Sequence, residues 1–191
     1  MLMTVVEGLR RARLASGLTL RAVAQRSGIA EANLSTIEHA RRDPTATTID
    51  RLTAALGIRL VPVATGGRPT AADIADIIGT SLRASDETRA YRAAVQLADD
   101  LDSADPHLKL LLTTEPARTG DPGWDAFLAA VTEWRLQQAG LPAPDWVRQT
   151  GTPVAAPWSP PGAILEARPD HVAEPFLRRG VLVEAAELTS T

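Results

Sequence analysis

Residues 14–45, LASGLTLRAVAQRSGIAEANLSTIEHARRDPT, decide the fold of the first part of this chain, because they predict two short helices joined by a tight turn. Thr19 can cap the first helix, since a threonine hydroxyl accepts a hydrogen bond from a backbone N–H two or three residues further on. Apolar side chains then recur at helical spacing on one face: Leu20, Val23 and Ala24. Gly28 ends this helix, because glycine readily adopts the left-handed conformation that a helix stop requires.

The second helix of this stretch starts a new apolar face at Ile29, which continues at Leu34 and Ile37. The polar positions between them are predicted to point outward: Glu31, Asn33, Ser35 and Thr36. A short helix, a turn that contains glycine and a second helix with an exposed polar face form the helix-turn-helix pattern.

Further motifs flank this pattern in order and without a gap. They are Leu9-Arg10-x-x-Arg13, Gly17-Leu18-Thr19, Val23-Ala24, Ser27-Gly28-Ile29, Leu34-Ser35-x-Ile37-Glu38, Arg41-Arg42-x-Pro44 and Leu52-x-x-Ala55-Leu56-Gly57-Ile58. With these motifs, residues 9–60 resemble the helix-turn-helix domain of the XRE family, the fold of the lambdoid phage repressors. The resemblance covers the first third of the chain and implies a five-helix-type domain over residues 1–65.

The resemblance also assigns roles to side chains. The residues expected to face DNA bases are Glu31, Ala32, Asn33 and Thr36, with Ser35 nearby. The residues expected to contact phosphates are Thr19, Arg21, Arg41 and Arg42. Glutamate can accept from the cytosine amino group, asparagine can bind adenine, and threonine can contact a thymine methyl. Arg13 and Glu38 are implied to form a partly buried structural ion pair that ties the first helix to the recognition helix.

Two positions depart from the family pattern. Leu20 stands where many relatives carry a glutamine that contacts phosphate. Ala30 replaces the usual serine or threonine cap of the recognition helix, a change that costs about 1 kcal/mol of helix stability. The sequence therefore predicts one phosphate contact fewer and a weaker start to the recognition helix.

Two more helices are predicted in the first domain. Residues 4–16 form one of them, with Val5, Leu9 and Leu14 inward, and residues 49–56 form the other, capped by Thr47 or Thr48. Residues 58–63, IRLVPV, predict a short edge strand. This strand is expected either to pair with the same segment of a second subunit, as in HipB-like antitoxins, or to lie against its own domain.

Residues 66–191 predict a second, mostly helical and proline-rich domain after the linker TGGRP. A first helix is expected from a Thr70-x-x-Asp73 capping box to residue 83, and a second one is expected to begin after a Ser85 cap. A third is expected from Pro106 to residue 112, and a strongly amphipathic helix is expected at residues 125–139. A helical patch near Phe176 and a strand at residues 181–183 follow.

The net charge also differs between the two predicted domains. Residues 1–65 carry nine arginines and five acidic residues, a balance of +4, and the remainder carries −7. A basic first domain suits phosphate contacts, although compositional drift would give the same split. The chain has no cysteine and no apolar run long enough to cross a membrane, so we expect no membrane partner and a cytoplasmic location.

Catalytic and metal sites are not predicted. His39, His107 and His171 lie far apart without metal-ligand spacing, and no phosphate-binding loop or nucleophile motif is present. The acidic residues from Asp99 to Asp105 lack the glycine and distal glutamate of a calcium loop, so we interpret them as a solvated helix end. We expect no catalytic residue, no metal and no cofactor.

The tryptophans gather in one window of the second domain: Trp124, Trp134, Trp146 and Trp158. They form either a small core or an anchor for a protein partner, and Trp158 is the best candidate for the second role. Segments at residues 139–146 and 176–184 are weakly similar to tails of XRE-type regulators found beside toxin genes.

The sequence therefore predicts a mostly helical regulator, a repressor, that binds a palindromic operator in double-stranded DNA as a homodimer. The expected role is that of an antitoxin, whose second domain binds a toxin while the first represses the operon. One alternative is a free-standing XRE repressor whose second domain senses a small ligand. Another is an enzyme or scaffold that uses the helix-turn-helix only for localisation.

Overall fold

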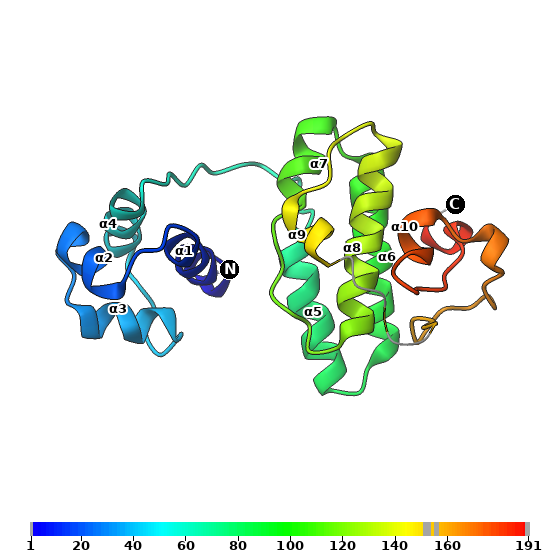
Figure 1. The fold of residues 1–191 in the computed structure, drawn as a ribbon, viewed down its shortest axis with the longest axis horizontal. Helices are drawn as coiled ribbons and strands as arrows, with labels where there is room; N and C mark the ends of the chain where they lie inside the picture. Colours follow the sequence, from blue (N-terminus) through cyan, green and yellow to red (C-terminus); the bar gives the residue numbers. More distant parts are fainter. Residues whose placement is uncertain (1, 151–153, 155–156, 190–191) are drawn as a thin grey trace. The chain divides into compact units, whose positions relative to one another are not determined.

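A computed structural model of the chain describes residues 2–150, 154 and 157–189. The chain divides into two compact units, which we call unit 1 (Met1–Val63) and unit 2 (Ala64–Thr191). Both are built from helices (Figure 1). Among the described residues, no helix is both long and apolar enough to cross a membrane.

Unit 1 contains the helices α1 (Leu2–Ala15), α2 (Leu20–Ser27), α3 (Glu31–Glu38) and α4 (Ala46–Leu56). α2 packs on α3 and α4, and α1 packs on the same two helices (Figure 1). The core is centred on a cluster with one buried side chain from each helix, Leu9, Val23, Leu34 and Leu52, and Val6 and Ile37 are buried as well. One prediction for α1 is wrong, since Leu14, expected inward, is 57 % exposed, whereas Val6 is buried.

The predicted five-helix type and its strand are both wrong for unit 1, which has the four helices α1–α4 and no β-strand among its described residues. Residues 58–63 follow Gly57 as an irregular segment that leaves large apolar side chains exposed: Leu60, Val61 and Val63. Pro62 contributes, because it has no N–H to donate to a strand. The cap of α4 is Thr45 and not Thr47 or Thr48 as predicted, since the Thr45 side chain accepts from the Thr48 N–H at 3.2 Å.

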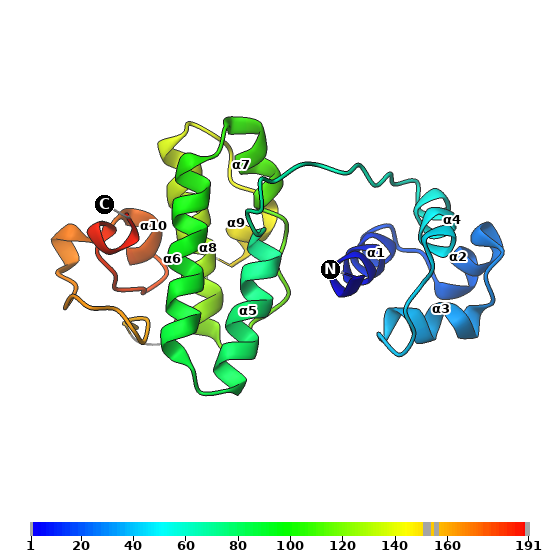
Figure 2. The same cartoon turned by 180° about the vertical axis from the view of Figure 1, so that it is seen from behind.

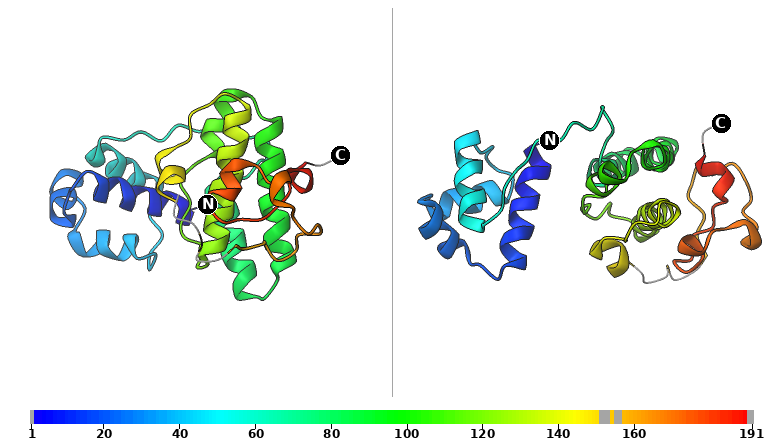
Figure 3. Two further views of the ribbon diagram at one scale, coloured as in Figure 1. Left: turned by 45° about the vertical axis from the view of Figure 1, so that its right-hand side comes forward. Right: turned by 90° about the horizontal axis from the view of Figure 1, so that it is seen from above.

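Unit 2 is organised around three long helices that pack against one another: α5 (Ala71–Arg83), α6 (Glu87–Ser103) and α8 (Pro122–Gln138). Figures 1 and 2 show them side by side from opposite faces, and the view from above in Figure 3 shows them nearly end-on. The shorter elements are α7 (Pro106–Leu112), α9 (Asp145–Gln149), α10 (Glu174–Leu177) and the 3-10 helices η1 (Pro169–His171) and η2 (Ala185–Leu188). The Thr70–Asp73 capping box begins α5 as predicted, whereas α6 is capped by Asp86 instead of Ser85.

α8 is the central helix of unit 2 and is not amphipathic as predicted, because every residue from Ala126 to Leu136 is buried. α5, α6, α9 and α10 all pack against it, so both of its faces meet apolar neighbours. Trp124, Trp134 and Trp146 are only 2–7 % exposed and belong to the same core, which favours the core interpretation of the tryptophans. Trp158 is half-buried and packs edge-on against Trp124, with the ring centroids 5.5 Å apart.

The last part of the chain packs on this helical core through apolar side chains, such as Phe176 and Val181, and through polar groups. Arg179 is fully buried and donates to the Glu133 carboxylate at 2.7 Å and to the Val147 carbonyl at 2.8 Å. The strand expected at residues 181–183 is reduced, in the described residues, to one parallel bridge between Trp158 and Val181. Neighbouring segments therefore dock by single hydrogen bonds and buried side chains and not by a sheet.

Candidate nucleic-acid interface

The first half of the helix-turn-helix forms as the local sequence dictates. The Thr19 side chain accepts a hydrogen bond from the Ala22 N–H at 3.1 Å and caps α2. Val23 is buried, and Gly28 ends the helix with φ at +66° while its N–H donates to the Ala24 carbonyl at 2.8 Å. Leu20 packs half-buried against the core.

α3 has one face in the core and one face in solvent. Leu34 and Ile37 are 2 % and 4 % exposed, so they fix the rotation of the helix about its axis. The predicted base contacts then divide into an exposed first turn and a half-buried continuation. Glu31, Ala32 and Asn33 are exposed, and Ser35 and Thr36 are half-buried. α3 therefore offers the short polar surface that a recognition helix requires.

The hydroxyl group of Thr36 is engaged within α3 itself. It lies 3.0 Å from the Ala32 carbonyl and 2.9 Å from the Asn33 carbonyl, and it can donate to either of them. Because that hydrogen is used inside the helix, Thr36 can present its methyl group and the oxygen lone pairs to a base. A methyl group is what contacts thymine in the major groove.

The end of α3 is fixed to α1 by the ion pair between Arg13 and Glu38. Nε and Nη2 of Arg13 donate to Oε1 and Oε2 of Glu38, both at 2.7 Å, and Nη1 donates to the Leu18 carbonyl at 2.9 Å. The hydrogen bond to Glu38 raises the pKa of Arg13 above its ordinary value. Both side chains are nearly buried, at 12 % and 13 % exposed, so the pair has a structural role.

Cationic side chains come before and after α3 along the chain. Arg41 and Arg42 come three and four residues after the last residue of α3 and are exposed. The backbone there is held by the Arg41 N–H, which donates to the Thr36 carbonyl at 2.9 Å, and Ala40 adopts a left-handed φ of +54°. Arg21, two residues after the capping residue Thr19, is also exposed. Guanidinium groups at these positions can bind phosphates without reading sequence.

One contact of the helix-turn-helix could not be predicted from the sequence. Nε of Arg51, in α4, donates to the carbonyl of Ser27 at 2.9 Å and thus holds the last residue of α2. The two residues are 24 positions apart, so no helical or turn periodicity connects them. Only the packing of α4 on α2 brings them together.

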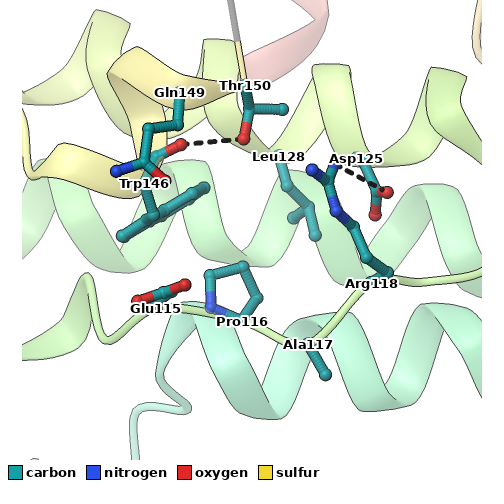
Figure 4. Close-up of a pocket in the computed structure, with 9 residues that line it drawn as sticks. All are labelled: Glu115, Pro116, Ala117, Arg118, Asp125, Leu128, Trp146, Gln149 and Thr150. Carbon is teal, nitrogen blue, oxygen red and sulfur yellow. Dashed lines mark hydrogen bonds and ion pairs between the residues drawn. The ribbon is translucent and has the colours of Figure 1, made fainter. Parts of the chain in front are cut away.

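Two of the hollows among the described residues of unit 2 are candidate ligand sites. One, shown in Figure 4, has a volume of about 60 Å³ and lies between the α7–α8 loop and α9, lined in part by Pro116, Leu128 and Trp146. It is far smaller than the roughly 300–1,000 Å³ of typical ligand pockets. The other is an open hollow of about 540 Å³ whose lining includes Arg148 and Arg178. Within the described residues, His, Asp and Glu side chains form no group of three that could hold a metal ion.

Comparison with known proteins identifies one part of the chain. No curated protein and no solved structure matches the chain. Residues 6–65 match a family described as a helix-turn-helix domain, and this range contains the four helices of unit 1 from the second turn of α1 onward. Unit 1 is a helix-turn-helix domain, and such a domain indicates a DNA-binding regulator.

Proposed function

We propose that this chain is a sequence-specific DNA-binding repressor that reads double-stranded DNA with α3. The observation that carries this proposal is the division of α3 into two faces. Burial of Leu34 and Ile37 directs the first-turn residues Glu31, Ala32 and Asn33 into solvent. A helix held in this way can enter the major groove, where its first turns meet base edges.

Affinity in this proposal comes from the flanking cations. Arg21, Arg41 and Arg42 are exposed, and Thr19 retains a hydroxyl hydrogen to donate although its oxygen caps α2. Each phosphate contact releases counterions, so it strengthens binding to any sequence and makes the affinity fall with added salt. Base contacts from α3 would then supply the discrimination, at about 1–3 kcal/mol for each well-made pair.

We propose that the active species is a homodimer on a palindromic operator. The support is the segment of residues 58–63, whose side chains Leu60, Val61 and Val63 are 53 %, 74 % and 46 % exposed. Consecutive apolar residues of this kind are expected to be covered, and a second copy of the segment would cover them. Sedimentation of the full chain with and without duplex DNA measures this directly.

The proposed reading surface is tested by selecting bound duplexes from a random pool and then comparing two variants on the selected site and on random DNA. Thr36→Ala should lower affinity for the selected site about tenfold, the low end of one base contact, and leave random DNA unchanged. Arg42→Ala should lower affinity for both and reduce the salt slope by about one phosphate contact. Arg92→Ala, which removes an exposed arginine from α6 of unit 2, is the matched control.

A wild-type chain that selects no sequence would refute the proposal. Equal losses on both DNAs for both variants would refute the division between reading and phosphate contact. An effect of Arg92→Ala as large as that of Arg42→Ala would mean that net charge, and not an interface on unit 1, governs binding.

For unit 2 we propose binding and not catalysis, in a cytoplasmic regulator. The specific role inferred from sequence is that of an antitoxin that neutralises a toxin, and it predicts that a neighbouring gene is toxic alone and silenced by co-expression. Burial of Trp124, Trp134 and Trp146 in the core removes them as exposed anchors for such a partner.

A ligand sensor is the alternative for unit 2, favoured by the open hollow of about 540 Å³. Arg148 and Arg178 would attract an anionic group there, although each already pairs with a carboxylate, Asp145 and Glu133 respectively. A small anion that raises the melting temperature of unit 2 and releases DNA would support the sensor. Co-purification of one stoichiometric protein would support the antitoxin.

A further inference from the structure

We infer that Arg51 is a positioning residue for DNA reading, because its Nε–H holds the turn from which the recognition helix starts. This inference rests on the proposed function, since it assigns a further residue to the same reading surface. Arg51 lies in α4, outside the helix-turn-helix itself, and acts through the backbone of Ser27.

We call the hydrogen bond between Arg51 and the Ser27 carbonyl the clamp. Nε of Arg51 donates to the Ser27 carbonyl at 2.9 Å, which occupies an acceptor that the end of α2 leaves without a helical partner. A Cβ atom built on Gly28 would come within 2.7 Å of Nη2 of Arg51, so the guanidinium group lies directly against the turn. Its positive charge also sits at the C-terminus of α2, where the helix dipole favours a cation.

The turn needs a link of this kind because its other bonds are local. The Gly28 N–H donates to the Ala24 carbonyl at 2.8 Å, and the Ile29 N–H donates to the Ser27 hydroxyl at 3.3 Å. Ala30 has no side-chain oxygen with which to cap α3. Arg51 adds a bond from α4, so the start of α3 is tied to the body of unit 1.

The consequence concerns discrimination more than affinity. Base contacts from Glu31 or Asn33 require a donor and an acceptor to meet at hydrogen-bond distance, and so a small rotation of α3 disrupts them. Phosphate contacts from exposed arginines tolerate such a rotation, because long side chains readjust. Loss of the clamp should therefore reduce the ratio between operator and random binding.

Three variants of Arg51 separate positioning from charge. Arg51→Gln keeps an N–H donor at the position of Nε but removes the charge. Arg51→Lys keeps the charge but places a methylene group where Nε stands. Arg51→Met removes both, and Arg59→Met removes the same charge from an exposed side chain beyond α4 as the control.

The readouts, all on the full chain, are the ratio of dissociation constants for random and selected duplexes and the amide hydrogen exchange of Ile29 and of the first turn of α3. Arg51→Lys and Arg51→Met should lower the ratio about tenfold, the scale of one lost hydrogen bond to a charged group. They should also accelerate exchange at Ile29. Arg51→Gln and Arg59→Met should stay within about twofold of wild type, the level expected when no hydrogen bond is lost.

The reverse order, with Lys active and Gln defective, would overturn the inference and make Arg51 a phosphate contact. An unchanged ratio in all three variants would overturn it as well. If the wild-type chain selects no sequence, the proposed function fails. The amide hydrogen exchange of Ile29 then still tests whether Arg51 holds the turn. Unchanged exchange in Arg51→Met would then show that Arg51 does not hold the turn.

Discussion

Replacement of Glu38 by glutamine tests whether the recognition helix depends on its ion pair with Arg13. The pair has two hydrogen bonds of 2.7 Å between side chains that are 12 % and 13 % exposed. Breaking a fully buried pair costs about 3–5 kcal/mol, and we expect about 2–3 kcal/mol here because water reaches the site and glutamine retains one weaker bond. A domain of this size has a total stability of roughly 3–9 kcal/mol, so the loss is large.

The assay uses the distribution of aromatic residues. Residues 1–63 contain no tryptophan, tyrosine or phenylalanine, so tryptophan fluorescence reports on unit 2 alone, whereas far-ultraviolet circular dichroism reports on the helices of both units. Glu38→Gln should lower the melting temperature of unit 1 in the dichroism signal by roughly 10–20 °C. The fluorescence transition of unit 2 should not move.

A double-mutant cycle of Arg13→Met and Glu38→Leu, each measured alone and combined, provides the control. Arg13→Met combined with Glu38→Leu should recover much of the stability, because neither variant side chain leaves a buried charge without a partner. Additive losses, or a dichroism transition that does not change in Glu38→Gln, would refute the view that this pair fixes α3 on α1.

Three further changes have expected outcomes. Ala30→Ser should stabilise unit 1 by about 1 kcal/mol in denaturant unfolding, because residue 30 is the N-cap of α3, with φ −58° and ψ 137°, and serine supplies the missing oxygen. Ala40→Gly should stabilise it by about 0.5–1 kcal/mol by the same measurement, because φ at residue 40 is +54° and glycine adopts it without strain. In unit 2, the pKa of Glu184 lies below its ordinary 4.5, mainly because its carboxylate accepts a hydrogen bond from the backbone N–H of Arg168 and also because of the hydrogen bond with the His171 side chain. Because this pKa is lower in the folded state than in the unfolded state, the Glu184 carboxylate stabilises unit 2 above about pH 4.5, and this stability is lost as the pH falls through the folded-state pKa. In Glu184→Gln, the stability of unit 2 monitored by tryptophan fluorescence should therefore fall less steeply below about pH 4.5.

The sequence by itself determined the elements that depend on neighbouring residues. Thr19 caps α2, Gly28 and Gly57 end their helices in the left-handed conformation, and Thr70 begins α5 with a capping box. Each of these features is a bond or a backbone preference that spans only a few positions, so a short motif contains all of its information.

The tertiary structure decided everything that depends on which surfaces meet. α8 has an apolar stripe in sequence, yet it is buried along its length because other helices cover its remaining faces. Residues 58–63 have the composition of a strand, yet they form none, because a strand needs a partner that local sequence does not supply. Arg51 reaches Ser27 across 24 positions for the same reason: its bond exists only after α4 has packed on α2, and no short-range pattern encodes that distance.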